Sequence, residues 1–463
     1  MNTNDTICAL ATAPGGALGI IRISGSKTFE AVSAICTISC ADCPPDTIHF
    51  ARLLSPHPLE GQEKASGEPL DEALVSIFHA PHSYTGEDSV EISCHGSHYI
   101  TKKILELLIE NGCRMANPGE FTQRAYLNGK LDLSQAEAVA DLIASTNRAT
   151  HQIAMSQLRG GISSQLATLR DQLLHLTSLL ELELDFSDHE DLEFADRSEL
   201  LTLAQTVDTH ITHLAKSFET GQALKQGIPV AIVGKTNVGK STLLNRLVKD
   251  DRALVSDIHG TTRDTIEEMM EINGVTFRFI DTAGIRQTSD TVEQMGIERT
   301  YQMIEKARIV LWLIDEQPTE KEQKDISERC KDKALIIVCN KSDKGVAVAK
   351  SLLFILHSSF LQISAKFDTS LSELETAIYD AANIPTLTDS DIIVTNARHY
   401  EALTRAHSHL YRVLDGLNNN LSGDLLAEDL RLVLSDLAEI TGEGLISSQE
   451  VLNTIFSQFC VGK

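Results

Sequence analysis

The spacing of hydrophobic positions changes along the chain and separates stretches of different character. Up to about residue 120, short Val- and Ile-rich runs are punctuated by Gly and Pro. This pattern predicts strands at Ile20–Ser24, Ile48–Leu54, Ala73–His79 and Val90–Cys94, mixed with helices. From Gly119 onward, apolar residues recur at three- and four-residue spacing, which predicts long amphipathic helices to about residue 220.

A third pattern begins near Gly227. The runs PVAIVG, FRFIDTAG, IVLWLID and ALIIVCN are strand-like and separated by helix-sized segments, which is typical of a largely parallel sheet with helices on both faces. After about residue 387 the helical spacing returns. We therefore expect an α+β domain over 1–120, a helical domain split between 121–226 and 387–463, and an α/β domain over 227–386 inserted into it.

The composition is that of a globular but strongly acidic protein. The 463 residues include 40 Lys and Arg against 65 Asp and Glu, a formal net charge of −25. Because basic side chains that neutralise phosphates dominate affinity for nucleic acids, any contact with RNA must use a local basic patch or a partner subunit. No apolar run approaches the roughly 18 residues that a membrane helix needs. With no basic leader and with dispersed cysteines, the chain is expected in the cytoplasm.

A phosphate-binding loop follows the first apolar run of the third stretch. Residues 234–241 read GKTNVGKS, which fits GxxxxGK[ST] between a predicted strand and a predicted helix. In such a loop the backbone N–H groups hold phosphate oxygens, Lys240 reaches the β- and γ-phosphates, and the Ser241 hydroxyl binds Mg²⁺. Downstream, Thr262 in GTTRD offers a second hydroxyl to Mg²⁺.

Further motifs select the nucleotide. DTAG ends a predicted strand, with Asp281 expected near the metal and the Gly284 amide near the γ-phosphate. NKSD closes another strand, and the Asp343 carboxylate suits the N1–H and 2-amino group of guanine, an edge that adenine lacks. ATP would leave that carboxylate unpaired, at a cost of ~1–3 kcal/mol for each buried group, so GTP is the predicted nucleotide. The segment SAK at 364–366 would complete the base pocket.

These motifs resemble those of the translation-factor-like GTPases. Ras-like enzymes place a water-orienting Gln just after DxxG, but this chain has Ile285 there, which cannot polarise water. Asn237 inside the phosphate loop marks potassium-activated GTPases, in which K⁺ replaces an arginine finger worth roughly 10³–10⁵ in rate. The resemblance implies K⁺ activation and a different group that orients the hydrolytic water.

Other stretches carry a more specific resemblance. GIIRISG, APHSYTGEDSVEISCHG, NPGEFTQRAYLNGKLDLSQAEAVADLI and FCVGK are similar to the MnmE (TrmE) family of tRNA-uridine-modifying GTPases, and the similarity covers essentially the whole chain. It implies an N-terminal domain that binds tetrahydrofolate and forms a homodimer, a helical domain and an inserted G domain. It also implies a heterotetramer-type complex with the flavoprotein MnmG, which acts on tRNA. The product would carry an aminomethyl or carboxymethylaminomethyl group at C5 of the wobble uridine.

The functional residues of that family correspond to positions of this sequence. The general base that acts on the hydrolytic water corresponds to Glu293, and Cys460 is a candidate nucleophile or acid–base group at the one-carbon unit. The folate contacts correspond to Arg22, Glu91, Lys130 and Lys463, the K⁺ contacts to Asn237, Ser256, Ile258 and Thr261. With Mg²⁺ on Ser241 and Thr262, the predicted GTP site comprises Asn237, Val238, Gly239, Lys240, Ser241, Thr242, Ser256, Asp257, Ile258, His259, Gly260, Thr261, Thr262, Asp281, Thr282, Ala283, Gly284, Asn340, Lys341, Asp343, Ser364, Ala365 and Lys366.

One alternative belongs to a different class. A ribosome-assembly GTPase, acting as an RNA-binding switch without modifying a base, would account equally well for the GTP motifs and for Ile285. The sequence lacks a GXXG-type RNA-binding segment and a basic C-terminal extension to carry RNA affinity. The N-terminal block and FCVGK would have no role in such a protein.

Overall fold

The computed structural model describes most of the chain and divides it into two compact units. It describes residues 5–55, 68–185, 197–249, 267–280, 293–344, 359–384, 391–419, 421–442, 452, 455–457, 459 and 462. The first unit comprises Met1–Ala144, Gln157–Val207 and Arg405–Lys463, and the second comprises Ser145–Ser156 and Asp208–Thr404.

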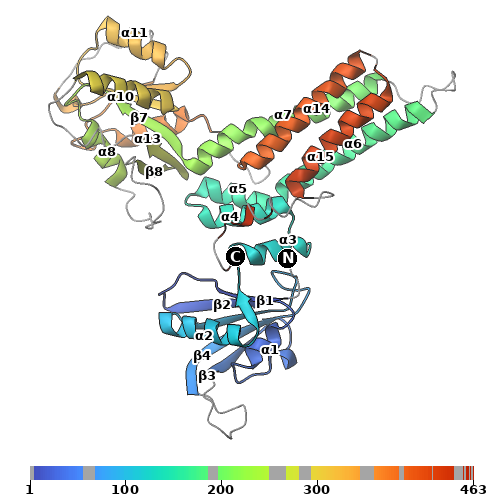
Figure 1. Ribbon diagram of the computed structural model, residues 1–463. Coiled ribbons are helices and arrows are strands. Elements are labelled where there is room, and N and C mark those ends of the chain that lie inside the picture. The colour runs from blue at the N-terminus through green and yellow to red at the C-terminus, as the bar shows by residue number, and fades with distance from the viewer. Residues whose placement is uncertain are drawn as a thin grey trace. The chain divides into compact units, whose positions relative to one another are not determined.

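The first unit contains a mixed sheet formed by the N-terminal stretch (Figure 1). In spatial order its strands are β3 (Thr47–Ser55), β4 (Glu68–Phe78), β5 (Ser89–His95), β2 (Leu18–Ser24), β1 (Thr6–Leu10) and β6 (Cys113–Met115). Neighbouring strands are antiparallel except β1 and β6, which are parallel. Alternate residues of the strands form a buried core with α1 (Thr28–Ser33) and α2 (His98–Glu110). The strands predicted from the sequence are confirmed as β2 to β5.

The opposite face of this sheet exposes large apolar side chains. Phe50 and Leu74 are register partners on β3 and β4, and they are 61% and 49% exposed. On the same face, Ile48 of β3 and Leu18 of β2 are 67% and 65% exposed. Exposed large apolar side chains on one sheet face often mark an interaction surface, and here Ser93 and His95 of β5 lie between Leu74 and Leu18.

Long helices follow the sheet, as the apolar spacing predicts. They are α3 (Glu120–Leu127), α4 (Leu133–Ala144), α5 (Arg148–Leu158), α6 (Gly161–Asp185), α7 (Arg197–Gln226), α14 (Ala397–Asn418) and α15 (Gly423–Thr441). Helix α6 packs along α15. Arg405 and His409 of α14 contact Asp436 of α15 at 3.1 and 2.8 Å. Helices far apart in the sequence therefore pack together. No helix in the described ranges is long and apolar enough to cross a membrane.

The second unit contains a largely parallel sheet. In spatial order its strands are β12 (Ser359–Gln362), β11 (Ala334–Cys339), β10 (Ile309–Ile314), β7 (Ile228–Val233), β9 (Val275–Phe279) and β8 (Glu268–Ile272). Only the β8–β9 pair is antiparallel. The central strand β10 is buried along its whole length, because helices cover both faces of the sheet.

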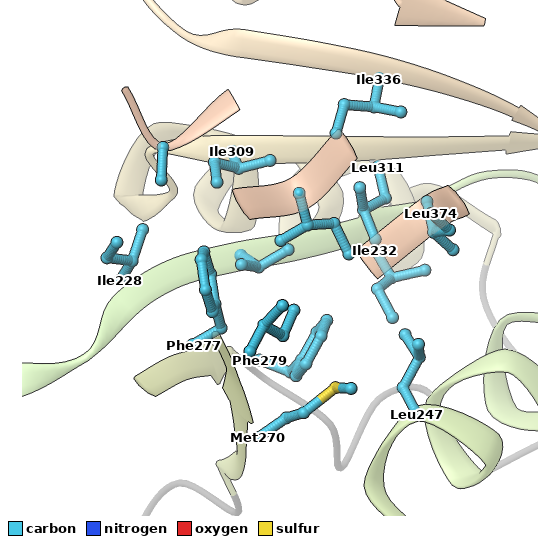
Figure 2. Close-up of a cluster of buried hydrophobic side chains, with 14 of the residues drawn as sticks. Ile228, Ile232, Leu247, Met270, Phe277, Phe279, Ile309, Leu311, Ile336 and Leu374 are labelled. Atoms are coloured by element: carbon cyan, nitrogen blue, oxygen red, sulfur yellow. The ribbon is translucent and has the colours of Figure 1, made fainter. Parts of the chain in front are cut away.

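Two hydrophobic clusters hold these layers together. On one face, Leu247 of α8 (Lys240–Lys249) and Leu374 of α13 (Leu371–Ala381) pack with Ile232 and Phe279 of the sheet (Figure 2). On the other face, residues of α10 (Glu293–Lys306) and α11 (Glu320–Arg329) pack against alternate residues of the same strands. The predicted fold class, an α+β region, long helices and a largely parallel α/β sheet, is confirmed.

Candidate functional site

The phosphate-binding loop lies where β7 passes into α8, and its backbone has conformations that suit its sequence. Gly234 has φ +151°, and a Cβ there would lie 2.3 Å from the carbonyl oxygen of Leu313. Gly239 has φ +104°, and a Cβ there would lie 2.3 Å from Asn340 Nδ2. Both positions therefore require glycine. Asn237 has φ +61°, a left-handed conformation that Asn tolerates better than most residues.

Lys240 begins α8 and turns its ammonium back over the loop. Its Nζ donates hydrogen bonds to the carbonyl oxygens of Gly234 at 2.6 Å and Lys235 at 2.7 Å. Burial lowers the pKa of the Lys240 ammonium from its usual range. Ser241 follows in the first turn of α8, half-buried, where the helix N-terminus favours anions. Lys240 and Ser241 thus both lie at the end of the loop, in the first turn of α8.

The predicted guanine-recognition motifs meet the phosphate loop through hydrogen bonds. The buried Asn340 donates from Nδ2 to the Val238 carbonyl at 2.8 Å and accepts from the Ala365 amide at 3.0 Å. The Ser364 hydroxyl donates to Asp343 Oδ1 at 2.8 Å. The structure therefore brings residues 237–242, 340–343 and 364–366 into one site, as the order of motifs predicts.

Two acidic residues that contact lysines beside this site were not singled out in the sequence. Asp315 Oδ2 lies 2.5 Å from Lys341 Nζ, which donates to the Asn237 carbonyl at 2.9 Å. Glu316 Oε1 lies 2.9 Å from Lys235 Nζ. Their place in the sequence could have indicated them. They directly follow the apolar run IVLWLI, and ligands of α/β sheets bind beyond the carboxyl ends of strands.

In the first unit, Arg22 and Glu91 contact each other. They are register partners on β2 and β5, and Arg22 Nε and Nη2 both lie 2.8 Å from Glu91 Oε1. The Arg22 Nη1 group donates to the Gly462 carbonyl at 3.2 Å. The guanidinium carbon lies 5.3 Å from the ring centroid of Tyr84 and 5.7 Å from that of Phe121. Sequence reasoning missed both rings.

The described part of the C-terminal segment lies against this region. Phe456 and Phe459 are buried in a cluster with Leu133 of α4. Gly462 has φ +93°, and a Cβ there would lie 2.5 Å from the carbonyl oxygen of Leu10. The segment thus approaches β1 more closely than any side chain would permit. Lys130, the remaining described residue of the predicted folate site, has a different partner. Its Nζ donates to the Pro81 carbonyl at 3.0 Å.

Several predicted site residues lie outside the described residues. They are Ser256, Asp257, Ile258, His259, Gly260, Thr261, Thr262, Asp281, Thr282, Ala283, Gly284, Cys460 and Lys463. Glu293 is the first residue of α10, but its side chain is not among those described. Within the described ranges, no group of three or more His, Cys, Asp or Glu side chains is placed to hold a metal ion.

Comparisons with known proteins cover the whole chain. A family model described as "GTP-binding protein TrmE N-terminus" matches residues 6–130, and one described as "MnmE helical domain" matches residues 133–460. The chain is 52% identical to a protein of Phocaeicola vulgatus named "tRNA modification GTPase MnmE", covering 100% of both. It is also 52% identical to a protein of the same name from Bacteroides thetaiotaomicron, covering 99% of both. Among solved structures, the G domain of the T. maritima FeoB iron transporter aligns with 34% of this chain and 98% of its own, at 23% identity and a TM-score of 0.26.

Proposed function

The chain belongs to the MnmE family of tRNA modification GTPases, and on that premise we propose that it is a potassium-activated GTPase that modifies the wobble uridine of certain tRNAs. With the flavoprotein MnmG, it would use the one-carbon unit of a tetrahydrofolate derivative to form the C5 aminomethyl or carboxymethylaminomethyl group. The observation that carries the GTP part is the hydrogen bond from Asn340 to the Val238 carbonyl. It joins guanine recognition to phosphate binding.

Two cations are proposed at the GTP site. Mg²⁺ would be held by Ser241 and Thr262, and K⁺ by Asn237, Ser256, Ile258 and Thr261. The described members fit these ions, because Ser241 lies in the first turn of α8 and the exposed Asn237 lies in the loop before it. Bound there, the cations supply positive charge against the charge that develops on the γ-phosphoryl oxygens.

The Glu293 carboxylate is proposed as the general base of hydrolysis. It would accept a proton from water as the water oxygen bonds to the γ-phosphorus and the bond to the β–γ bridging oxygen breaks, giving GDP and phosphate. Ile285, directly after DTAG, has no polar group for this role. Glu293, at the start of α10, would supply the proton-accepting group that Ile285 lacks.

The one-carbon site is proposed in the first unit, at Arg22, Glu91, Lys130 and Lys463. Guanidinium and ammonium groups suit the carboxylates of folate, and a carboxylate suits the N–H and amino edge of a pterin. Arg22 Nε and Nη2 contact Oε1 of Glu91, and the second carboxylate oxygen, Oε2, would accept from that edge. Cys460 is proposed to act there as nucleophile or acid–base group, since Gly462, two residues later, is bonded to Arg22.

The homodimer is proposed to form through the apolar face of the N-terminal sheet. Phe50 and Leu74 lie side by side on that face, and Leu18 of β2 is a further exposed apolar side chain on it, beyond Ser93 and His95 of β5. Burying such side chains against the same face of a second chain removes a large apolar area from water, at about 25 cal/mol per Å².

The GTP site is proposed to communicate with the rest of the chain through α5. The β8–β9 hairpin lies between the segments that carry Thr262 and Asp281. Its Gly274 carbonyl accepts from the Ala149 amide of α5 at 3.0 Å, and its Thr276 hydroxyl accepts from Asn147 Nδ2 at 2.8 Å. Coupling between the GTP site and the rest of the chain requires that the GTP- and GDP-bound states favour different arrangements of α5 and the β8–β9 hairpin.

The proposed location is the cytoplasm, where a tRNA substrate and reduced thiols are both found. The eight cysteines that the structure describes are all free. The net charge of −25 implies that tRNA is bound through a local patch or through the partner.

Nucleoside analysis of tRNA tests the proposal. A strain that lacks this protein should lose the C5-substituted wobble uridine, and the gene should restore it. An unchanged nucleoside profile together with defective ribosomal subunits would instead support the ribosome-assembly alternative. For the purified protein, GTP turnover should rise steeply when K⁺ replaces Na⁺, and equal rates would refute K⁺ activation.

A further inference from the structure

The carboxyl end of β10 offers two consecutive carboxylates to the phosphate loop. Asp315 contacts Lys341 at 2.5 Å, and the same ammonium donates to the carbonyl of Asn237 at 2.9 Å. Glu316 contacts Lys235 at 2.9 Å. Two residues of the loop, 235 and 237, are thus connected to neighbouring positions of one strand end.

The two connections differ in strength because they differ in exposure. The side chains of Lys235 and Glu316 are 51% and 66% exposed, so this pair contributes little net stability, and Lys235 also contacts Glu322 at 3.2 Å. Those of Lys341 and Asp315 are 29% and 27% exposed, and the pair is a short charge-assisted contact. The Asp315 connection is therefore the one that can fix the loop.

The contact with Asn237 determines where a phosphate-binding amide points. In a trans peptide the carbonyl and the following N–H point in opposite directions. The Asn237 carbonyl is turned toward Lys341, so the N–H of Val238 points away from Lys341. The next carbonyl, that of Val238, is held by Asn340 in the same way. Asn237 itself has the left-handed φ of +61°, which needs such support.

We propose that Asp315 is a positioning residue for GTP hydrolysis, which holds the Lys341 ammonium against the Asn237 carbonyl. A lysine stem is flexible, and without its carboxylate the ammonium has several alternative positions in water. The Asn237 peptide then loses its donor, and the loop spends less time in the conformation that presents the Asn237 amide to K⁺. The K⁺ part of this inference rests on the proposed function, whereas the effect on the loop does not.

The test uses the full chain and compares Asp315→Asn with Glu316→Gln. Asparagine keeps an acceptor oxygen at the same place but removes the charge, and the neighbouring substitution makes the same chemical change at the exposed pair. GTP turnover is measured at saturating GTP while KCl is titrated at constant ionic strength. We expect Asp315→Asn to raise the half-saturating K⁺ concentration about tenfold, and Glu316→Gln to change it by less than about twofold. The thermal unfolding midpoints of both variants should stay within a few degrees of the parent.

The affinity for GDP gives a second readout that does not depend on K⁺ activation. Asp315→Asn should weaken GDP binding about tenfold, and it should have no further effect in a Lys341→Met background, because Asp315 acts through Lys341. Equal effects of the two carboxylate substitutions, or an undiminished effect of Asp315→Asn in the Lys341→Met background, would overturn the inference. A parent protein that ignores K⁺ but shows the expected GDP series would refute K⁺ activation while supporting the role of Asp315.

Discussion

The side-chain amide of Asn340 donates a hydrogen bond of 2.8 Å to the backbone carbonyl of Val238. Asn340 belongs to the segment proposed to recognise the base and Val238 to the loop proposed to bind the phosphates, so moving one of these segments would move the other. Because Asn340 also accepts from the Ala365 amide, three loops of the site share one buried side chain. Hydrogen bonds in such a buried network are worth more together than singly.

Gly239→Ala should abolish nucleotide binding. The new methyl would lie 2.3 Å from Asn340 Nδ2, and the backbone has φ +104°, so the substitution both displaces the shared amide and strains the loop. We expect GDP affinity to fall at least about a hundredfold by fluorescence titration, since several buried hydrogen bonds are disturbed together. Gly112→Ala is the control for backbone strain. Gly112 also has a positive φ, +93°, but a Cβ there would meet nothing within 4 Å, so the loss of thermal stability of this variant measures the strain without a clash. Near-normal GDP affinity of Gly239→Ala would contradict the structure of this site.

Glu293→Ala should stop hydrolysis and leave GTP affinity near normal. The residue stands at the start of α10, and a general base contributes about 10²–10⁴ in rate without binding the ground state. Single-turnover hydrolysis and nucleotide titration of the same preparation separate the two quantities. Unchanged turnover would remove Glu293 from the mechanism.

Asn147→Ser should uncouple GTP hydrolysis from tRNA modification. Asn147 caps the first turn of α5 by accepting from the Thr150 amide at 2.9 Å, and it donates to Thr276 of the hairpin at 2.8 Å. Serine retains a capping oxygen but is too short to reach the hairpin. We expect GTP turnover within about threefold of the parent, and a loss of most of the modified nucleoside in a complementation assay.

Thr150→Ala is the matched control for this change. Its hydroxyl donates to the Asn147 carbonyl at 3.0 Å and to Asn147 Oδ1 at 3.1 Å, so the change removes bonds within the same helical turn and leaves the Asn147 amide group that donates to Thr276. If Asn147→Ser and Thr150→Ala reduced tRNA modification equally, the effect would come from a less stable α5 and not from the lost contact with the hairpin.

The buried ion network around Glu120 should make the first unit sensitive to acid. Burial raises the pKa of Glu120, but hydrogen bonds from Arg114, the Asn117 amide and Arg124, together with the charge of Arg114, outweigh it and hold the pKa below the usual 4.5. Such a carboxylate contributes stability that is fully present above its unfolded pKa and is lost as the pH falls through its lower folded pKa. The protection of residues 113–127 against hydrogen exchange, relative to an unfolded peptide at the same pH, should therefore fall at pH values below about 4.5.

Glu120→Gln should reduce that acid sensitivity and lower stability at neutral pH. Glu120 is 1% exposed, and its neighbour Arg124 would keep Asp5 at 2.7 Å and Glu87 at 3.1 Å. The expected loss is about 1–3 kcal/mol, the cost of leaving a buried donor without its acceptor. Unaltered protection of residues 113–127 in the parent between about pH 5 and pH 3 would show that the network does not titrate in this range.

The sequence predicted the long and strongly patterned elements of the fold. β7, β10 and β11 are continuous apolar runs, and only a sheet covered on both faces can bury them. It did not indicate β6, because Cys113–Met115 is too short to show a period and pairs with β1, about a hundred residues earlier. Such a pairing depends on the folded N-terminal unit as a whole.

The candidate site was predicted in its motifs but not in its contacts. GKTNVGKS and NKSD fix the residue types that the chemistry needs, and the structure brings them together. The link through Asp315 joins a strand end to Lys341, 26 positions later, and no local pattern carries that information. Arg22 and Glu91 were predicted as contacts of a ligand, but the register of β2 on β5 also pairs them with each other.

Two segments that flank the predicted inserted domain contact each other. Gln222, near the end of α7, donates to the Thr395 carbonyl at 2.8 Å, and a Cβ on Gly221 would lie 2.1 Å from the Val394 carbonyl oxygen. Because these two segments lie close together, they are suitable cut points for protein engineering. The domain can be excised between these residues as a cassette, with a short Gly-rich bridge closing the helical remainder, and grafted into another host without spreading the host's chain apart.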